Sequence, residues 1–172
     1  MVFLKLITVD HFYTQEEGYN ISKVILPLMQ FEKNDLGEDL INFNMVPNDA
    51  DEIFSKVLNS EVVVEKEKSG VFRKPDFSGF IHFEEFESVN DWLFVVALEP
   101  TTFNVFEHKS GAKNAMEGYE FAYRNLFDWN LKTNIILEPG QGVFFRPWLF
   151  HSFNSGLIQI FRLKEISCQQ QT

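Results

Sequence analysis

The chain has 172 residues, the length of a single domain. It is acidic, with 25 Asp and Glu against 15 Lys and Arg and a net charge of −10. We therefore do not expect nucleic acid as a partner, because binding phosphates needs a basic surface. Hydrophobic residues make up 45% of the chain and 20 residues are Phe, which supplies enough apolar side-chain area for a sizeable core.

The sequence has no run of about 18 uninterrupted apolar residues, the length that a membrane span needs. Its apolar start, residues 1–9, is too short for a signal peptide and is followed at once by Asp10 and His11. The single cysteine, Cys168, excludes an intramolecular disulfide and favours a reducing compartment. We therefore expect a cytoplasmic protein that does not contact a membrane.

The first 60 residues predict one strand and two helices. Residues 2–9 have the composition of a strand, and Thr14 with Glu17 three positions later forms a capping box that starts a helix. Pro27 is expected to kink or end this helix, since it lacks a backbone donor. Helical spacing predicts one buried face made of Ile21, Val24, Ile25 and Leu28.

A second helix is predicted over residues 48–58, and the chain beyond it is rich in strands. This helix is expected to bury Ile53, Phe54, Val57 and Leu58. Residues 110–118 contain glycine and predict a loop. Apolar runs and alternating patterns predict strands over residues 62–64, 92–98, 101–108, 119–123, 134–137, 143–145 and 157–163.

Two early helices followed by many short strands indicate an α+β chain that is mainly β and antiparallel. The number of strands suits a double-sheet jelly roll. We expect one domain over residues 1–172, in which residues 1–60 support a β core of residues 61–165 and residues 166–172 form a tail.

Three residues carry the pattern of a metal site. His82 and Glu84 are two positions apart, so on a strand their side chains point to the same face. His151 follows a strand that comes after the Pro139-Gly140 turn, and a facing strand could bring it to the same place. Two histidines and one carboxylate are the ligand set of non-haem Fe(II) sites. Alternatively, His82 is a core histidine, residues 83–87 are a solvated acidic turn, and His151 is a surface imidazole.

Arg162 is the candidate for binding an anion. It lies in the predicted strand 157–163 and shares one face with Ile158 and Ile160. A guanidinium on an apolar face needs an anionic partner, which could be a dicarboxylate cosubstrate or an acidic side chain of the protein. Rival candidates for this role are Arg73, Arg124 and Arg146.

Other chemistries find less support. Glu85 competes with Glu84 as a ligand, whereas His108 is expected at a loop edge and His11 is expected to be structural or exposed. Cys168 lies too near the terminus to be a good nucleophile. The sequence has no Gly-rich phosphate loop, no paired-cysteine zinc site and no Gly-x-Ser-x-Gly motif.

In order and spacing, these residues resemble the His-x-Asp/Glu, distant His, then Arg or Lys pattern of the Fe(II)/2-oxoglutarate-dependent dioxygenases, especially the prolyl-hydroxylase-like branch. The matching residues are His82, Glu84, His151 and Arg162, and the resemblance covers residues 70–164. The chain departs from the pattern in having Glu84 where Asp is usual. In style it resembles small bacteriophage-encoded members, which would place it in the host cytoplasm.

The resemblance implies a double-stranded β-helix in which His82, Glu84 and His151 bind Fe(II) and Arg162 holds the distal carboxylate of 2-oxoglutarate. It implies oxidative decarboxylation to succinate and CO₂, coupled to hydroxylation of a small molecule or a protein side chain. A cupin-like metal protein of other chemistry and a non-catalytic binding or structural module of the same fold remain alternatives. An exposed apolar patch could also support a homodimer.

Overall fold

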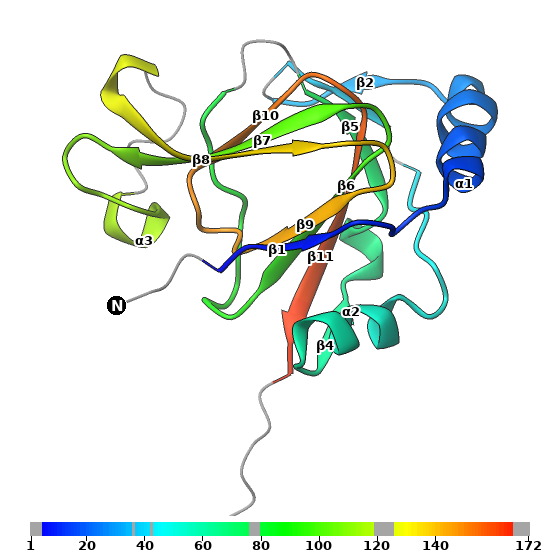
Figure 1. The fold of residues 1–172 in the computed structure, drawn as a ribbon, viewed down its shortest axis with the longest axis horizontal. Coiled ribbons are helices and arrows are strands. Elements are labelled where there is room, and N and C mark those ends of the chain that lie inside the picture. The colour runs from blue at the N-terminus through cyan, green and yellow to red at the C-terminus, as the bar shows by residue number, and fades with distance from the viewer. Residues whose placement is uncertain (1–4, 36, 42, 76–79, 119–125, 167–172) are drawn as a thin grey trace, which may run out of the picture.

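The computed structural model describes residues 5–35, 37–41, 43–75, 80–118 and 126–166. Figure 1 shows two β-sheets that face each other, with the helices of the first 60 residues on the right, away from the N-terminus. The strand pairs within both sheets are antiparallel. The larger sheet has eight strands, ordered β1 (Ile7–Val9), β9 (Gly142–Phe145), β6 (Trp92–Ala97), β11 (Ile158–Glu165), β5 (Val71–Lys74), β3 (Asp39–Ile41) and β2 (Glu32–Lys33), with β4 (Val62–Val64) also paired to β11.

The smaller sheet has three strands, ordered β10 (His151–Asn154), β7 (Thr101–His108) and β8 (Trp129–Leu137). An isolated bridge between His82 and His151 extends it by one more segment. From β5 onward the chain passes back and forth between the sheets, because β6, β9 and β11 belong to the larger sheet whereas residue 82, β7, β8 and β10 belong to the smaller one. The predicted fold, mainly β and a double-stranded β-helix, is confirmed.

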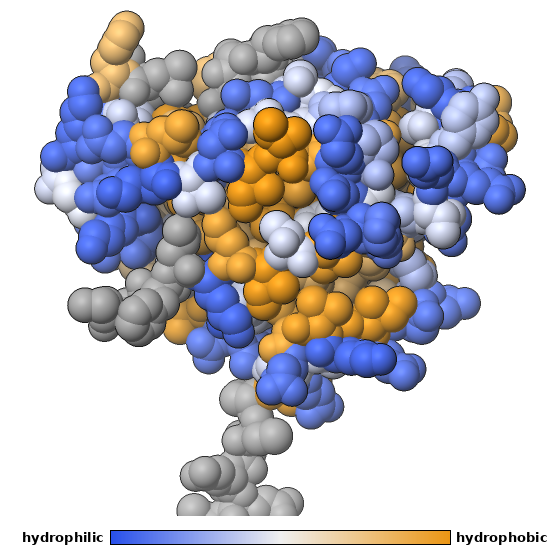
Figure 2. Space-filling view, in the orientation of Figure 1, coloured by the Kyte–Doolittle hydropathy of each residue, from blue (hydrophilic) through white to orange (hydrophobic). Residues whose placement is uncertain are grey.

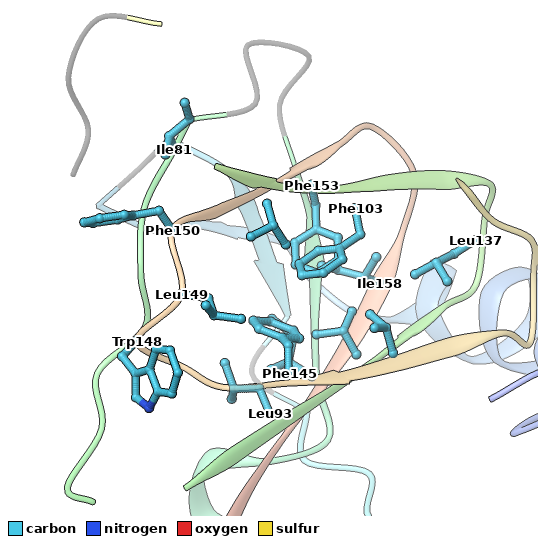
Figure 3. Close-up of a cluster of buried hydrophobic side chains, with 14 of the residues drawn as sticks. Ile81, Leu93, Phe103, Leu137, Phe145, Trp148, Leu149, Phe150, Phe153 and Ile158 are labelled. Atoms are coloured by element: carbon cyan, nitrogen blue, oxygen red, sulfur yellow. The ribbon is translucent and has the colours of Figure 1, made fainter. Parts of the chain in front are cut away.

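The apolar side chains form two layers, one on each face of the larger sheet. The inner layer lies between the sheets and includes Leu93, Phe103 and Phe145, which point toward one another in Figure 3. The outer layer lies between the larger sheet and the N-terminal elements and includes Phe54 and Phe94. Strand β6 is buried on both faces, which explains its uninterrupted apolar sequence.

The predicted first helix is confirmed, whereas the prediction of its buried face is partly wrong. Helix α1 spans Gln15–Tyr19, and the Thr14 side chain accepts the Glu17 backbone N–H in the predicted capping box. A π-helical turn, Asn20–Ile25, and a 3₁₀ turn, Leu26–Leu28, follow. This change of helix type alters the spacing of the side chains. As a result Ile21 and Leu26 are buried, Ile25 is half-buried, and Val24 and Leu28 are exposed.

The second helix is also confirmed. Helix α2 spans Ala50–Leu58 and buries Ala50, Phe54 and Leu58 at every fourth position. Ile53 and Val57 were predicted to be buried and instead lie at the surface, because the stripe that faces the sheet is narrow. Figure 2 shows apolar surface near α2 and in the middle of the same face. Whether such a surface supports a homodimer stays a prediction.

Most predicted strands are present, with shifted ends. Strand β7 has the predicted bounds, whereas β8 begins five residues before the predicted residue 134. Strands β2, β3, β5 and β10 were not predicted, and helix α3 (Ala115–Gly118) lies in the expected loop. The predicted strand over residues 119–123 lies outside the described residues. Two further 3₁₀ turns span Lys66–Lys68 and Leu126–Asp128.

Among the described residues, no helix has the length and apolar character that crossing a membrane requires.

Candidate metal centre

Two backbone hydrogen bonds bring the two predicted histidine ligands together. The His82 N–H donates to the His151 carbonyl at 3.0 Å, and the His151 N–H donates to the His82 carbonyl at 2.8 Å. This is an antiparallel pair in which directly opposed side chains share one face. The two imidazole rings are accordingly 4.5 Å apart between centroids. The pairing continues where the Glu84 N–H donates to the Pro147 carbonyl at 2.9 Å, which fixes Glu84 beside the pair.

Both imidazoles are oriented by a hydrogen bond between Nδ1 and a backbone carbonyl. His82 Nδ1 lies 2.9 Å from the carbonyl of Phe80, and His151 Nδ1 lies 2.7 Å from the carbonyl of Leu149. A carbonyl can only accept, so each Nδ1 carries the proton and donates it. The lone pair of each ring is therefore on Nε2, which is the arrangement that a second partner imposes on metal-binding histidines.

His151 Nε2 is a buried acceptor without a hydrogen-bond partner among the described residues. Burial, and after it the neighbouring His82, lower the pKa of His151 to about 3. The ring is therefore neutral at physiological pH. A buried acceptor of this kind is uncommon in folded proteins and requires an explanation.

Glu84 completes the group. Its Oε1 lies 3.2 Å from His82 Nε2, although both atoms are acceptors when His82 Nδ1 holds the proton, so a cation or a second proton is needed between them. Two ligand atoms bound at right angles, each about 2.1 Å from one ion, lie about 3 Å apart. The ligand atoms of His82, Glu84 and His151 all lie within 4.8 Å of one another. The three buried residues fit a divalent metal ion.

Two arginines hold the Glu84 carboxylate. Arg73 Nη1 donates to Oε1 at 2.8 Å, and Arg162 Nη2 donates to Oε2 at 2.8 Å. Burial by itself would raise the pKa of Glu84, but the neighbouring positive charges, Arg73 first and then Arg162, help to hold the pKa well below its usual range. Glu84 is therefore an ionised carboxylate despite its burial, the form that binds metal.

The structure separates the three rival arginines. Arg73 reaches the candidate centre, as described above. Arg146 does not, because its guanidinium lies 3.6 Å from the centroid of the Trp92 ring and forms an ion pair with Glu165. Arg124 lies outside the described residues.

The other candidate residues are remote from the centre or face away from it. The Glu85 side chain is exposed, and only its backbone carbonyl takes part, accepting from Arg162 at 2.9 Å. His108 is bonded to Ser110 at 2.8 Å, and His11 is exposed. Cys168 lies outside the described residues. Within the described part of the chain, His82, Glu84 and His151 are the one group that could share an ion.

A pocket of about 530 Å³ reaches Arg162 at the edge of the centre, although none of the three candidate metal ligands lines it. Arg162 lines it, together with Phe83 and Glu85, the two sequence neighbours of Glu84. Apolar walls come from Phe86, Leu93, Pro147 and other residues. Its volume is within the range of small-molecule sites, about 300–1,000 Å³.

The fold has relatives among solved structures. SnoN, a non-haem α-ketoglutarate-dependent epimerase from nogalamycin biosynthesis, has a TM-score of 0.62 and 12% sequence identity over 93% of this chain and 78% of SnoN. HygX from Streptomyces hygroscopicus, solved with nickel and 2-oxoglutarate, has a TM-score of 0.55 and 9% identity over 93% of this chain and 82% of HygX. The chain has the double-stranded β-helix fold of the 2-oxoglutarate-dependent oxygenases. The resemblance seen in the sequence is thus confirmed at the level of the fold.

Comparison with known sequences adds no relatives to those found by structure. No protein-family model matches the chain, and a search of curated protein sequences finds no match either. The structural similarity to SnoN and HygX, at 12% and 9% sequence identity, supports a shared fold and does not assign an activity. The chemistry has to be argued from the side chains.

Proposed function

We propose that the chain is an Fe(II)- and 2-oxoglutarate-dependent oxygenase that acts on a small molecule. The observation that carries this proposal is the orphaned Nε2 of buried, neutral His151, which faces His82 and Glu84 across a gap of metal-binding size. Two imidazoles and one carboxylate leave coordination positions open, as an iron that takes both a cosubstrate and O₂ requires. When bound, the iron and 2-oxoglutarate together supply the activation of O₂.

The charges of the residues around the centre favour binding of a metal ion together with a dianion. Glu84 and Glu38 carry two negative charges, and Arg73 and Arg162 carry two positive charges within the same ion-pair network. A divalent cation adds two positive charges that this network does not offset. A cosubstrate with two carboxylates supplies the missing charge, so the network favours an ion and a dianion together.

Arg162 is the proposed anchor for the distal carboxylate. It lines the pocket beside the centre, and its present partners are Glu84 Oε2 and the Glu85 carbonyl. A carboxylate entering from the pocket would take over these donors as a bidentate pair. Arg162 thereby orients the cosubstrate so that its other end faces the metal ligands.

Aromatic rings keep water from the centre. Phe145 lies 4.7 Å from the ring of His151 in an edge-on arrangement, and Phe103 and Phe153 lie 5.9 and 5.8 Å from it. Exclusion of water prevents side reactions of a reactive intermediate. For the substrate, the relatives point to small molecules, since HygX has also been solved with hygromycin B bound, at a TM-score of 0.52 to this chain.

The test is an anaerobic titration of the apoprotein with Fe(II) and 2-oxoglutarate, followed by the visible charge-transfer band of the chelate. We expect the band in the parent protein and its loss in His82→Ala. In Arg162→Ala we expect iron to bind while the band requires more 2-oxoglutarate. Iron binding without any band would support the cupin-like alternative, and absence of iron binding would support a non-catalytic module.

A further inference from the structure

The two oxygens of Glu84 are held from two neighbouring strands. Arg73 on β5 binds Oε1, and Arg162 on β11 binds Oε2. The strands pair in antiparallel register, with Ile158 opposite Arg73. Val71, two residues before Arg73 on β5, packs against the inner layer, as do Ile158 and Ile160 before Arg162. Both guanidiniums therefore reach the centre from the inner face of the larger sheet.

Arg73 forms an ion pair with a second buried carboxylate at its other side. Its Nε lies 3.5 Å from Glu38 Oε2, and the Glu38 side chain is 7% exposed. Glu38 is itself held, since Asn34 Nδ2 donates to Oε2 at 2.9 Å and the Glu38 N–H donates to Asn34 Oδ1 at 2.9 Å. Gly37 gives the turn its left-handed residue, with φ of 76°.

Strand pairing aligns this turn with Arg73. Strands β2 and β3 form the hairpin, and β3 pairs with β5 so that Leu40 lies opposite Arg73. The hairpin thus carries Glu38 to the Nε side of the guanidinium. Glu38, Arg73 and Glu84 form a chain of three charged groups that runs from the hairpin to the metal ligands.

Arg162 is held less firmly. Its side chain is 21% exposed against 12% for Arg73, and it borders the pocket. Its two terminal nitrogens are used on Glu84 Oε2 and on the Glu85 carbonyl. Binding an incoming carboxylate through both nitrogens requires Arg162 to release at least one of these partners.

We propose that Arg73, braced by Glu38, is the positioning residue that keeps Glu84 Oε1 aimed at the metal while Arg162 exchanges Glu84 for the cosubstrate. This inference rests on the proposed function for the exchange at Arg162. The positioning itself needs only the metal site. Arg73 and Arg162, which the sequence offered as rival anchors for the cosubstrate, thus have different roles in this proposal.

Charge-preserving variants test the proposal, because removing a positive charge near the ion would by itself strengthen metal binding and obscure the effect. Arg73→Lys keeps the charge but lacks the planar fork that spans Glu38 and Glu84. We expect it to weaken Fe(II) binding about tenfold or more, the usual loss when a partner of a metal ligand is changed. Its apparent affinity for 2-oxoglutarate, measured at saturating iron, should remain within about threefold of the parent.

Arg162→Lys is the matched variant, and we expect the opposite pattern: iron affinity within about threefold of the parent and 2-oxoglutarate affinity about tenfold lower. Lys74→Gln, which changes the exposed neighbour of Arg73 on β5, should leave both affinities unchanged. A general loss of structure cannot give this crossed pattern, since it would lower both affinities in each variant.

Glu38→Gln probes the brace. We expect weaker iron binding in this variant and no further loss when Arg73→Lys is added, because the two residues act on Glu84 through one contact. Additive losses would contradict the chain from Glu38 to Glu84. If Arg73→Lys binds iron like the parent, the inference is wrong and the proposed function stands. If the parent binds no iron, the proposed function fails and the inference fails with it.

Discussion

Two groups of buried polar side chains in this protein, one in each apolar layer, differ in how their hydrogen bonds are made. In the outer layer Tyr13 donates to Gln159 Oε1 at 2.6 Å, and Gln159 Nε2 donates to the carbonyls of Met45 and Gly70 at 2.9 and 3.0 Å. These polar atoms find their partners within the protein. In the inner layer the corresponding polar side chains are His82, Glu84 and His151, and His151 Nε2 has no partner among the described residues.

The difference separates a structural polar group from a binding site. Burial is similar in the two cases, since Gln159 and His151 are both fully buried. The two cases differ in whether the buried polar atoms make their hydrogen bonds. A buried group with all its hydrogen bonds made stabilises the fold, whereas a group with an unused lone pair is destabilising until a ligand supplies the bond. The inner layer thus carries a cost in the free protein that a bound metal ion would remove.

The largest expected effect comes from substituting His151, the inner-layer residue whose Nε2 has no partner among the described residues. In His151→Ala we expect the affinity for Fe(II) to fall by more than about a hundredfold, because one of three ligands is lost. At an ion concentration one hundred times the dissociation constant, the parent should gain about 2.7 kcal/mol of stability. That corresponds to a rise of about 5–10 °C in Tm for a chain of this size. Anaerobic calorimetric titration and thermal denaturation measure both quantities.

The control is His108→Ala, which removes a histidine bonded to Ser110 outside the centre. It should bind iron and shift in Tm as the parent does. An equal thermal shift in the parent and in His151→Ala would mean that the ion binds elsewhere.

A substitution among the hydrogen-bonded polar side chains of the outer layer should change the stability of the protein and leave iron binding unchanged. In Tyr13→Phe the Gln159 Oε1 atom loses its donor within a buried layer, and we expect a loss of about 1–3 kcal/mol in the free energy of unfolding. Iron affinity should be unchanged, because the larger sheet separates Tyr13 from the metal ligands. Urea denaturation and the iron titration report the two effects separately, and weaker iron binding here would erase the distinction between the layers.

The sequence predicted the centre better than its surroundings. His82 and Glu84 share a face because residues two apart on an extended chain must do so. Arg162 shares the inner face with Ile158 and Ile160 for the same reason. Such local rules need no knowledge of distant contacts. Of the two partners that the sequence left open for Arg162, the structure shows the acidic side chain, Glu84, and binding of a cosubstrate stays a prediction.

Long-range contacts were beyond the sequence. Arg73 sits in a four-residue strand, β5, that was not predicted because its pattern is too short to distinguish from a loop. Its role depends on pairing with β3 and β11, which lie 30 or more positions away in the chain. Likewise, Val24 and Leu28 fit a helical face but became exposed when the helix changed type at the π-helical turn.

A further expected effect is a pH dependence of the apoprotein. Burial lowers the pKa of His151 from 6.5 in the unfolded chain to about 3 in the folded one. Between these values the unfolded state binds a proton that the folded state does not, so stability falls as the pH falls. The slope from His151 is about 1.4 kcal/mol per pH unit.

The window from pH 6.5 to 4.5 isolates this slope from Glu84. The pKa of Glu84 is lowered on folding from 4.5, so its contribution to stability is lost only as the pH falls below that value. We therefore expect urea denaturation of metal-free protein to show stability declining across the window, with a smaller decline in His151→Ala and an unchanged one in His108→Ala. A parent slope equal to that of His151→Ala would mean that folding does not lower the pKa of His151, and that its ring is not the buried neutral imidazole on which the contrast rests.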